Sequence, residues 1–269
     1  MRDTSQPVPF VPATRAVFDL SLEGMIWSRR SLLMGLLVGV PLIVAVVYRV
    51  LLAAEVLPSA APPLDLYGFA VAIIWVRNLL PLMALFHATS LIADEVEGRT
   101  LTYLLTRPLT RPAIFAGKFA AYLATSLGIA LPSAVLTFFL LVTARGWSGV
   151  GASVPDLLRD LGVMTLTVLA YGALFALLGV LLRRPVIPGL LFLFGWELMA
   201  NLPGYLPRLT LTAYLRSLIH HRPAQEGLAG LFNQVQPVGL SLAVVLATTT
   251  LFLGAAAWLF SEREYVLEQ

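Results

Sequence analysis

Cysteine is absent from this 269-residue sequence, and charge is scarce. The lack of cysteine excludes disulfides, thiol catalysis and cysteine-ligated metal sites. Charged residues make up 12% of the chain, about half the share of an ordinary soluble domain. Lys118 is the only lysine, and the net charge of +3 is spread along the chain, which excludes a nucleic-acid-binding face. Hydrophobic residues amount to 58%, an excess that indicates a hydrocarbon solvent rather than a soluble core.

Motifs for nucleotide binding and for intramembrane catalysis are also absent. A P-loop needs a glycine, four residues, and then Gly-Lys-Ser/Thr. The only Gly-Lys pair, Gly117-Lys118, has Pro112 in place of the upstream glycine and Phe119 in place of the Ser or Thr. The sequence has no His-Glu-x-x-His helix, no evident intramembrane Ser-His pair and no carboxylate cluster. We therefore predict that the chain itself binds no cofactor or metal and is not an enzyme.

The long apolar runs predict an all-α integral membrane protein with six transmembrane helices. A helix needs about 20 mostly apolar residues to cross a bilayer, and these runs lack the period-two alternation of a β-barrel. Pro132 is expected to kink or tilt the third span, while Pro188 and Glu197 interrupt the fifth. The predicted spans cover residues 31–53, 71–93, 113–143, 157–182, 185–202 and 238–260.

Arginine placement predicts the orientation in the membrane. Arg29 and Arg30 abut the first span, and the short Arg183-Arg184 turn joins the fourth and fifth spans. Because basic residues concentrate on the cytoplasmic side, we expect both termini in the cytoplasm of a cell whose inner (plasma) membrane holds the chain. The predicted organisation is a cytoplasmic segment at 1–30, a six-span domain at 31–260 and a cytoplasmic tail at 261–269.

The segment between the second and third spans is the most organised polar stretch. Acidic residues come first and basic residues last, an order that suits a short helix because each charge opposes the helix dipole. Glu95 and Arg99 are four residues apart, Pro108 would end the helix, and leucines supply an apolar side. The sequence predicts a short amphipathic helix at the cytoplasmic face. It either lies on lipid or docks on a cytoplasmic partner.

This segment resembles the signature of ABC-2 type transporter permeases. The similarity runs through Glu95-Val96-Glu97-Gly98-Arg99-Thr100-Leu101, Leu104-Leu105-Thr106-Arg107-Pro108-Leu109-Thr110-Arg111 and Gly117-Lys118. It departs at Arg99, since many members have Gly and Thr adjacent. The resemblance implies a second permease copy, in a homodimer or heterodimer, and a separate ABC ATPase subunit that holds ATP and Mg²⁺. It also implies a membrane-surface helix near residues 14–28. The residues implied in coupling to the ATPase are Asp94, Glu95, Glu97, Gly98, Arg99, Thr100, Leu104, Leu105, Arg107, Pro108 and Arg111.

Ionisable residues inside spans are candidates for the transport pathway, because burying them in lipid is costly. Arg77 and Glu197 both fall in outer halves of spans, and we predict that they pair or that Glu197 merely lies near the outer headgroups. His87 is expected to be a hydrogen-bonded packing residue or a proton relay. Gly35 and Gly39 form a small-xxx-small pattern that permits close helix packing, either within the subunit or at a dimer seam.

The function favoured by these features is the permease subunit of an ATP-driven transporter that moves its substrate outward. The alternatives are an ion-coupled secondary carrier and a membrane-embedded enzyme. Few charges fall near the midplane, which disfavours a carrier. The outer loop at 203–237 is expected to form short helices that cap the exit path, and its adjacent His220-His221 lacks a third ligand for a metal. The spans lack a polar stripe, which favours amphipathic or lipidic cargo.

Overall fold

The computed structural model describes residues 9–56, 62–97, 110–147, 150–202, 204–220 and 236–262. Within these ranges every regular element is a helix. The prediction of an all-α membrane protein is confirmed in this coarse form, because five helices are long and apolar enough to cross a membrane. Their bounds are Arg29–Ala53, Pro63–Leu91, Arg111–Val142, Val150–Leu181 and Val238–Glu262.

The fifth predicted span, at 185–202, is not confirmed. Residues 185–202 form α9 (Val186–Leu191), a π-helical turn η3 (Phe192–Trp196) and a 3₁₀ segment η4 (Glu197–Asn201). This apolar stretch, Val186–Asn201, is shorter than the 18 residues that a candidate membrane-spanning helix needs. At 1.5 Å per residue it reaches about 24 Å, which is short of the roughly 30 Å hydrocarbon core.

Glycine and proline affect the long helices differently: Gly39 divides the first one, whereas Pro132 does not divide α7. The first long helix is divided into α2 (Arg29–Val38) and α3 (Val40–Ala53), where Gly39 ends one and Pro41 stands in the first turn of the next. Pro132 lies inside α7 (Arg111–Val142), which continues past it. The second helix begins earlier than predicted, with α4 (Pro63–Phe69), a long π-helical segment η1 (Ala70–Leu79) and then α5 (Leu80–Glu97).

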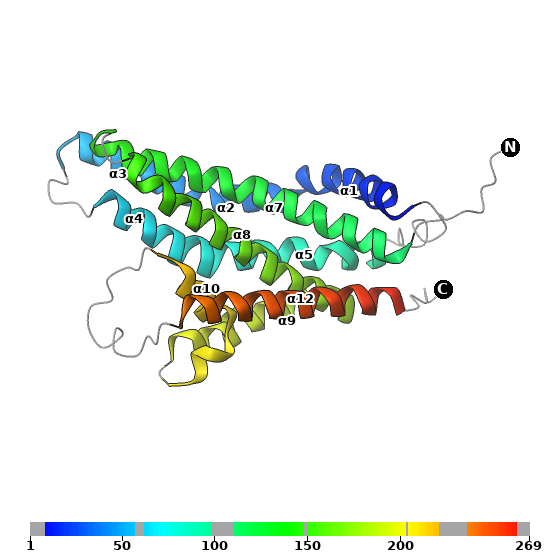
Figure 1. Ribbon diagram of the computed structural model, residues 1–269. Helices are drawn as coiled ribbons and strands as arrows, with labels where there is room; N and C mark the ends of the chain where they lie inside the picture. Colours follow the sequence, from blue (N-terminus) through cyan, green and yellow to red (C-terminus); the bar gives the residue numbers. More distant parts are fainter. Residues whose placement is uncertain are drawn as a thin grey trace.

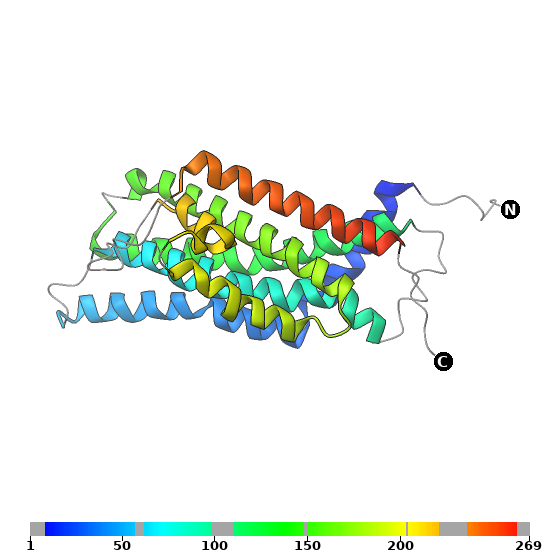
Figure 2. The same cartoon turned by 90° about the horizontal axis from the view of Figure 1, so that it is seen from below.

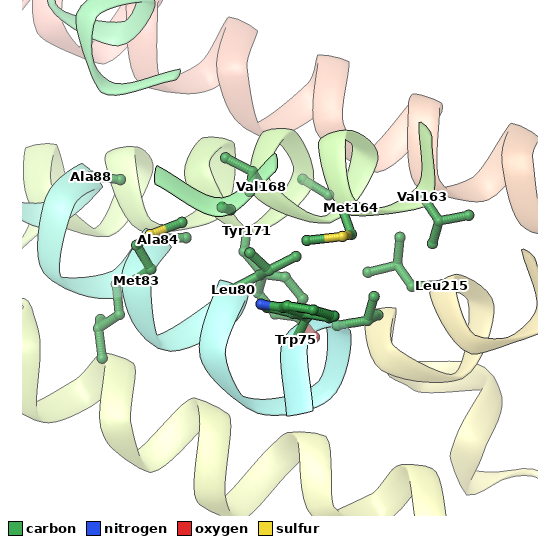
Figure 3. Packing of buried hydrophobic residues seen from close by; sticks show 14 of the residues in the cluster. Trp75, Leu80, Met83, Ala84, Ala88, Val163, Met164, Val168, Tyr171 and Leu215 are labelled. Atoms are coloured by element: carbon green, nitrogen blue, oxygen red, sulfur yellow. The ribbon is translucent and has the colours of Figure 1, made fainter. Parts of the chain in front are cut away.

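The core is built around α8 (Val150–Leu181). Its most apolar stretch is 72% buried, against 17% for α12 (Val238–Glu262) and 22% for Arg29–Ala53, so α8 is central and those two helices are peripheral. Figure 3 shows Trp75 from η1, Met164 from α8 and Leu215 from α10 (Leu211–Leu218) converging at one end of this core. The exposed apolar faces of the peripheral helices are available for lipid or another subunit.

Helix α1 and the termini of three long helices lie together at one end of the bundle. Figure 1 shows α1 (Phe10–Ile26), the end of α5, the start of α7 and the end of α12 on the right, whereas α3, α4 and α10 lie toward the left. Figure 2 shows the same grouping from below. The helix expected near residues 14–28 is therefore present as α1, and it packs mainly along α7. We call this region the α1 end of the bundle.

Candidate functional site

The loop implied in coupling joins α5 to α7 at the α1 end. Residues 98–109 lie outside the described residues, and with them Gly98, Arg99, Thr100, Leu104, Leu105, Arg107 and Pro108. The backbone of Asp94, Glu95 and Glu97 belongs to the last turns of α5, which runs through Glu97. A separate helix therefore does not begin near Asp94. The larger part of the predicted amphipathic helix falls on residues 98–109, outside the described residues, and that helix stays a prediction.

Arg111 ties the end of this loop to the last helix. It is the first residue of α7, and its guanidinium donates to the carbonyl oxygen of Ser261 at 2.8 Å. Ser261 lies in the last turn of α12, where carbonyl groups lack partners within the helix. A cation at this negative helix end is favourable. Arg111 therefore connects the start of α7 to the end of α12.

The Gly117-Lys118 pair brings α1 against α7. A Cβ atom at Gly117 would lie 2.6 Å from the backbone oxygen of Thr14 and 2.9 Å from the Cβ of Val17, so only glycine permits this approach. Lys118 is 6% exposed, and its ammonium donates to the backbone oxygen of Leu91 at 3.0 Å. The pair that opens the third span thus holds α1 on one side and the end of α5 on the other.

His87 contacts two serines on two other helices, and no local pattern in the sequence predicts either contact. It is 2% exposed on α5; its Nε2 lies 3.1 Å from the Ser31 hydroxyl of α2, and its Nδ1 lies 3.3 Å from the Ser126 hydroxyl of α7. Ser31 donates its own proton to the Met25 carbonyl, so the imidazole Nε2–H must donate to Ser31. Ser126 then donates to Nδ1. Both ring nitrogens of His87 therefore have hydrogen-bond partners, and its role as a proton relay stays a prediction.

Away from the α1 end, a second set of polar residues lines a cavity of about 130 Å³. Arg77 and Asn78 line it from η1, Glu197 lines it from η4, and Thr212 lines it from α10. Both π-helical segments, η1 and η3, contribute to its wall. π-Helical turns are rare and frequently occur at functional sites. This cavity is therefore the candidate site at the far end of the bundle.

Glu197 caps α10 rather than forming the predicted pair with Arg77. Its two carboxylate oxygens accept the backbone N–H groups of Leu211 at 3.2 Å and Thr212 at 3.0 Å. The Thr212 hydroxyl in turn lies 2.9 Å from the hydroxyl of Tyr171 on α8. Arg77 and Glu197 line the same cavity, yet no ion pair joins them among the described contacts. An acidic group satisfies the otherwise unpaired N–H groups at a helix start, which explains why Glu197 turns toward α10.

The glycine pattern on the first span has no packing partner within the described part of the subunit. A Cβ atom at Gly35 would meet nothing within 4 Å, and one at Gly39 would meet only the backbone of its own helix. Close approach occurs instead at Gly179, where a Cβ would lie 3.0 Å from the backbone oxygen of Thr89 on α5. Packing of Gly35 and Gly39 at a dimer seam stays a prediction.

Sequence reasoning missed one buried charge. Asp160 is wholly buried in α8 although it falls within the predicted span at 157–182. It comes three residues after the predicted start of that span, next to Arg159. The signal that could have found it is the general rarity of carboxylates inside spans. Among the described residues no group of three His, Cys, Asp or Glu side chains could hold a metal ion.

A family model for the ABC-2 family transporter protein matches residues 75–265, which is more than half of the chain. The chain belongs to the ABC-2 transporter family. No curated protein matches it. The matched part of this ABC-2 permease begins within η1 and includes the loop at 98–109, the Gly117-Lys118 pair and Glu197. The first long helix and α1 precede the match, so the contacts of α1 with α7 lie partly outside it.

Membership in the family establishes the general role of the chain as a membrane component of a transporter. ABC-2 permeases are membrane components of ABC-type transporters, so this chain is a multi-pass membrane component of such a transporter.

Proposed function

We propose that the chain is the permease subunit of an outward-moving transporter, and that its loop between α5 and α7 docks on a separate ATPase subunit. The observation that carries this proposal is the family match across residues 75–265, which contains that loop. The absence of a P-loop in the sequence is consistent with ATP and Mg²⁺ being held by the partner. ATP-driven closure of two ATPase subunits would then push on the loop.

The helices around the loop offer a route for this movement. The loop connects directly to α5 and α7, Arg111 connects α7 to α12, and Gly117 seats α1 on α7. A rigid-body shift of these elements would move the α1 end as a unit. At the far end, Glu197 and Thr212 link η4 to α10 beside the core helix α8, so this linkage would respond to movement of α8.

Two permease copies and a defined orientation complete the proposal. The exposed apolar faces of α12 and of α2–α3 supply surface for a second copy, as a homodimer or heterodimer, in addition to lipid. The described chain begins with α1 and ends with α12 at the same end of the bundle. We place that end in the cytoplasm and the bundle in the inner (plasma) membrane, because Arg29, Arg30 and the Arg183-Arg184 turn are basic there.

Co-purification with a co-expressed ABC ATPase subunit tests the proposal. The triple variant Glu95→Lys, Glu97→Lys, Arg107→Glu should lower both the amount of ATPase retained and the ATP turnover of the complex. The matched control is Arg183→Gln with Arg184→Gln, which changes two exposed cations outside the loop. Full retention and turnover in the triple variant would overturn the docking role of the loop, as would finding the loop outside the cell by thiol labelling.

A further inference from the structure

Helix α10 covers the end of the core that lies away from α1. Its buried side chains Leu211 and Leu215 and the following Ile219 repeat every four residues, so they share one face of the helix. α10 packs against η1, α8 and α12. Figure 3 shows Leu215 on the side of α10 that faces Trp75 and Met164 of the core. α10 is therefore a buried cover over this end of the bundle rather than a surface helix.

Hydrogen bonds from neighbouring elements hold α10 at both of its ends. The helix has 8 residues, and helices shorter than about 12–15 residues are only marginally stable on their own. At its start, the Glu197 carboxylate of η4 accepts the backbone N–H groups of Leu211 and Thr212. At its end, the Ser217 hydroxyl oxygen accepts the backbone N–H of Gln236, which precedes α12, at 3.3 Å. α10 therefore depends on a few contacts that a small movement can break.

Tyr171 connects the start of α10 to the core helix α8. Its hydroxyl lies 2.9 Å from the Thr212 hydroxyl, and the backbone N–H of the same threonine donates to Glu197. A shift of α8 relative to η4 would therefore stretch both contacts of Thr212 at once. We call the bonds of Glu197 and Tyr171 to the start of α10 the α10 latch.

The indole of Trp75 gives the covered state a cost. Trp75 is wholly buried in η1, and its Nε1–H has no hydrogen-bond partner among the described residues. A buried donor without a partner is unfavourable compared with a donor that water can reach. Movement of α10 away from η1 would let water bind this N–H. The α10 latch thus holds the helix against a term that favours its release.

We propose that α10 is a movable cover over the far end of the core, that Glu197 and Tyr171 hold it closed, and that it lifts when α8 moves during ATP turnover. The closed state and the α10 latch need no ATPase subunit. Only the link to ATP turnover rests on the transport function proposed above. The latch can therefore be tested, and can fail, separately from the docking of the loop.

Thiol labelling of the purified full chain tests the latch, because the chain has no cysteine of its own. Leu215→Cys places one buried thiol on α10, and a water-soluble maleimide should reach it only when α10 lifts. Glu197→Gln leaves one acceptor oxygen for two N–H groups, so it should speed this labelling about 5-fold to 30-fold, the typical effect of losing a helix cap. Tyr171→Phe removes only the contact with Thr212 and should speed it about 2-fold to 10-fold.

Matched variants separate the latch from a general loosening of the fold. Tyr122→Phe also removes a buried tyrosine hydroxyl, but that hydroxyl donates to the Val168 carbonyl of α8, so labelling of Leu215→Cys should stay unchanged. Leu209→Cys, at an exposed position before α10, reports the intrinsic reaction rate and should react equally in every background. Ile219→Cys, at a buried position after α10, is a second reporter in case Leu215→Cys does not fold.

The complex with a co-expressed ABC ATPase subunit tests the link to ATP turnover. Leu215→Cys should react faster during ATP hydrolysis than without nucleotide, by at least the factor that Tyr171→Phe gives in the purified chain. Leu209→Cys should react at one rate in both conditions. If no ATPase subunit binds the chain, the transport function proposed above fails, and the purified chain still decides whether the latch exists.

Three results would overturn the proposal. Equal acceleration by Tyr171→Phe and Tyr122→Phe would show general loosening in place of a latch. Unchanged labelling in Glu197→Gln would show that the carboxylate does not hold α10. Equal labelling of Leu215→Cys with and without ATP, in a complex that hydrolyses ATP, would reject α10 as a part that moves.

Discussion

Replacing Gly117 by alanine should loosen α1 from α7, because this is where the two helices approach most closely through a glycine. The added Cβ would lie 2.6 Å from the backbone oxygen of Thr14, whereas ordinary contacts begin near 3.4 Å. A backbone atom cannot turn aside as a flexible side chain does. The helices must therefore separate by roughly 0.8 Å, a gap that forfeits about a quarter to a half of each dispersion contact across it.

The magnitude follows from a comparison with Gly128→Ala. Both positions lie inside α7, so both substitutions gain up to about 1 kcal/mol from the higher helix propensity of alanine. A Cβ at Gly128 would meet nothing within 4 Å, and so only Gly117→Ala also carries the cost of overpacking, typically about 1–3 kcal/mol. The difference between the two variants isolates that cost. It should appear as easier separation of α1.

The absence of cysteine makes a single-thiol assay possible. Val17 on α1 is 3% exposed and packs against α7, so a Val17→Cys thiol should react with a maleimide only when α1 lifts. A cost of about 1–3 kcal/mol corresponds to labelling about 5-fold to 150-fold faster in the Gly117→Ala background than in the Gly128→Ala background. Leu20→Cys, at a position that is 65% exposed, reports the intrinsic reaction rate.

The reasoning is refuted if Val17→Cys reacts at the same rate in both alanine backgrounds. That result would mean that α1 is already separated from α7 in the membrane, or that α7 bends to admit the extra methyl group. Faster reaction of Leu20→Cys as well would instead show a change in reagent access, and it would remove the link to helix separation.

Three further substitutions test the polar contacts. Glu197→Gln should lower the free energy of unfolding by about 1–2 kcal/mol, because an amide has one acceptor oxygen for the two N–H groups at the start of α10. Thermal unfolding measures this loss. The control Glu23→Gln, at an exposed position, should leave the unfolding midpoint unchanged. His87→Phe should cost about 1–3 kcal/mol in the same assay, since it leaves two buried serine hydroxyls without the imidazole, and a neutral result would remove its packing role. Arg111→Gln should reduce transport per ATP hydrolysed more than it reduces ATPase retention, because it removes the hydrogen bond to Ser261 of α12 and leaves residues 98–109 unchanged. Equal reductions of transport and of retention would contradict this prediction.

The local features of this chain could be predicted from the sequence, because a bilayer imposes a minimum length of apolar helix that composition alone reveals. The starts at Arg29 and Val238 agree with the predicted spans within two residues. The family resemblance, carried by a short run of residues at 95–118, is confirmed by the match over 75–265. The predicted span at 185–202 is not confirmed, because this apolar run folds as three successive kinds of helix, α, π and 3₁₀.

Contacts between distant segments could be decided only by the tertiary structure. The sequence offered Arg77 as the partner of Glu197, but the carboxylate instead satisfies the start of α10, a helix whose position no local pattern fixes. The cavity that Arg77 and Glu197 line likewise depends on how η1, η4 and α10 pack together. Apolar length and charge order are properties of neighbouring residues along the chain. A hydrogen-bond partner or a cavity is a property of residues that only packing brings together.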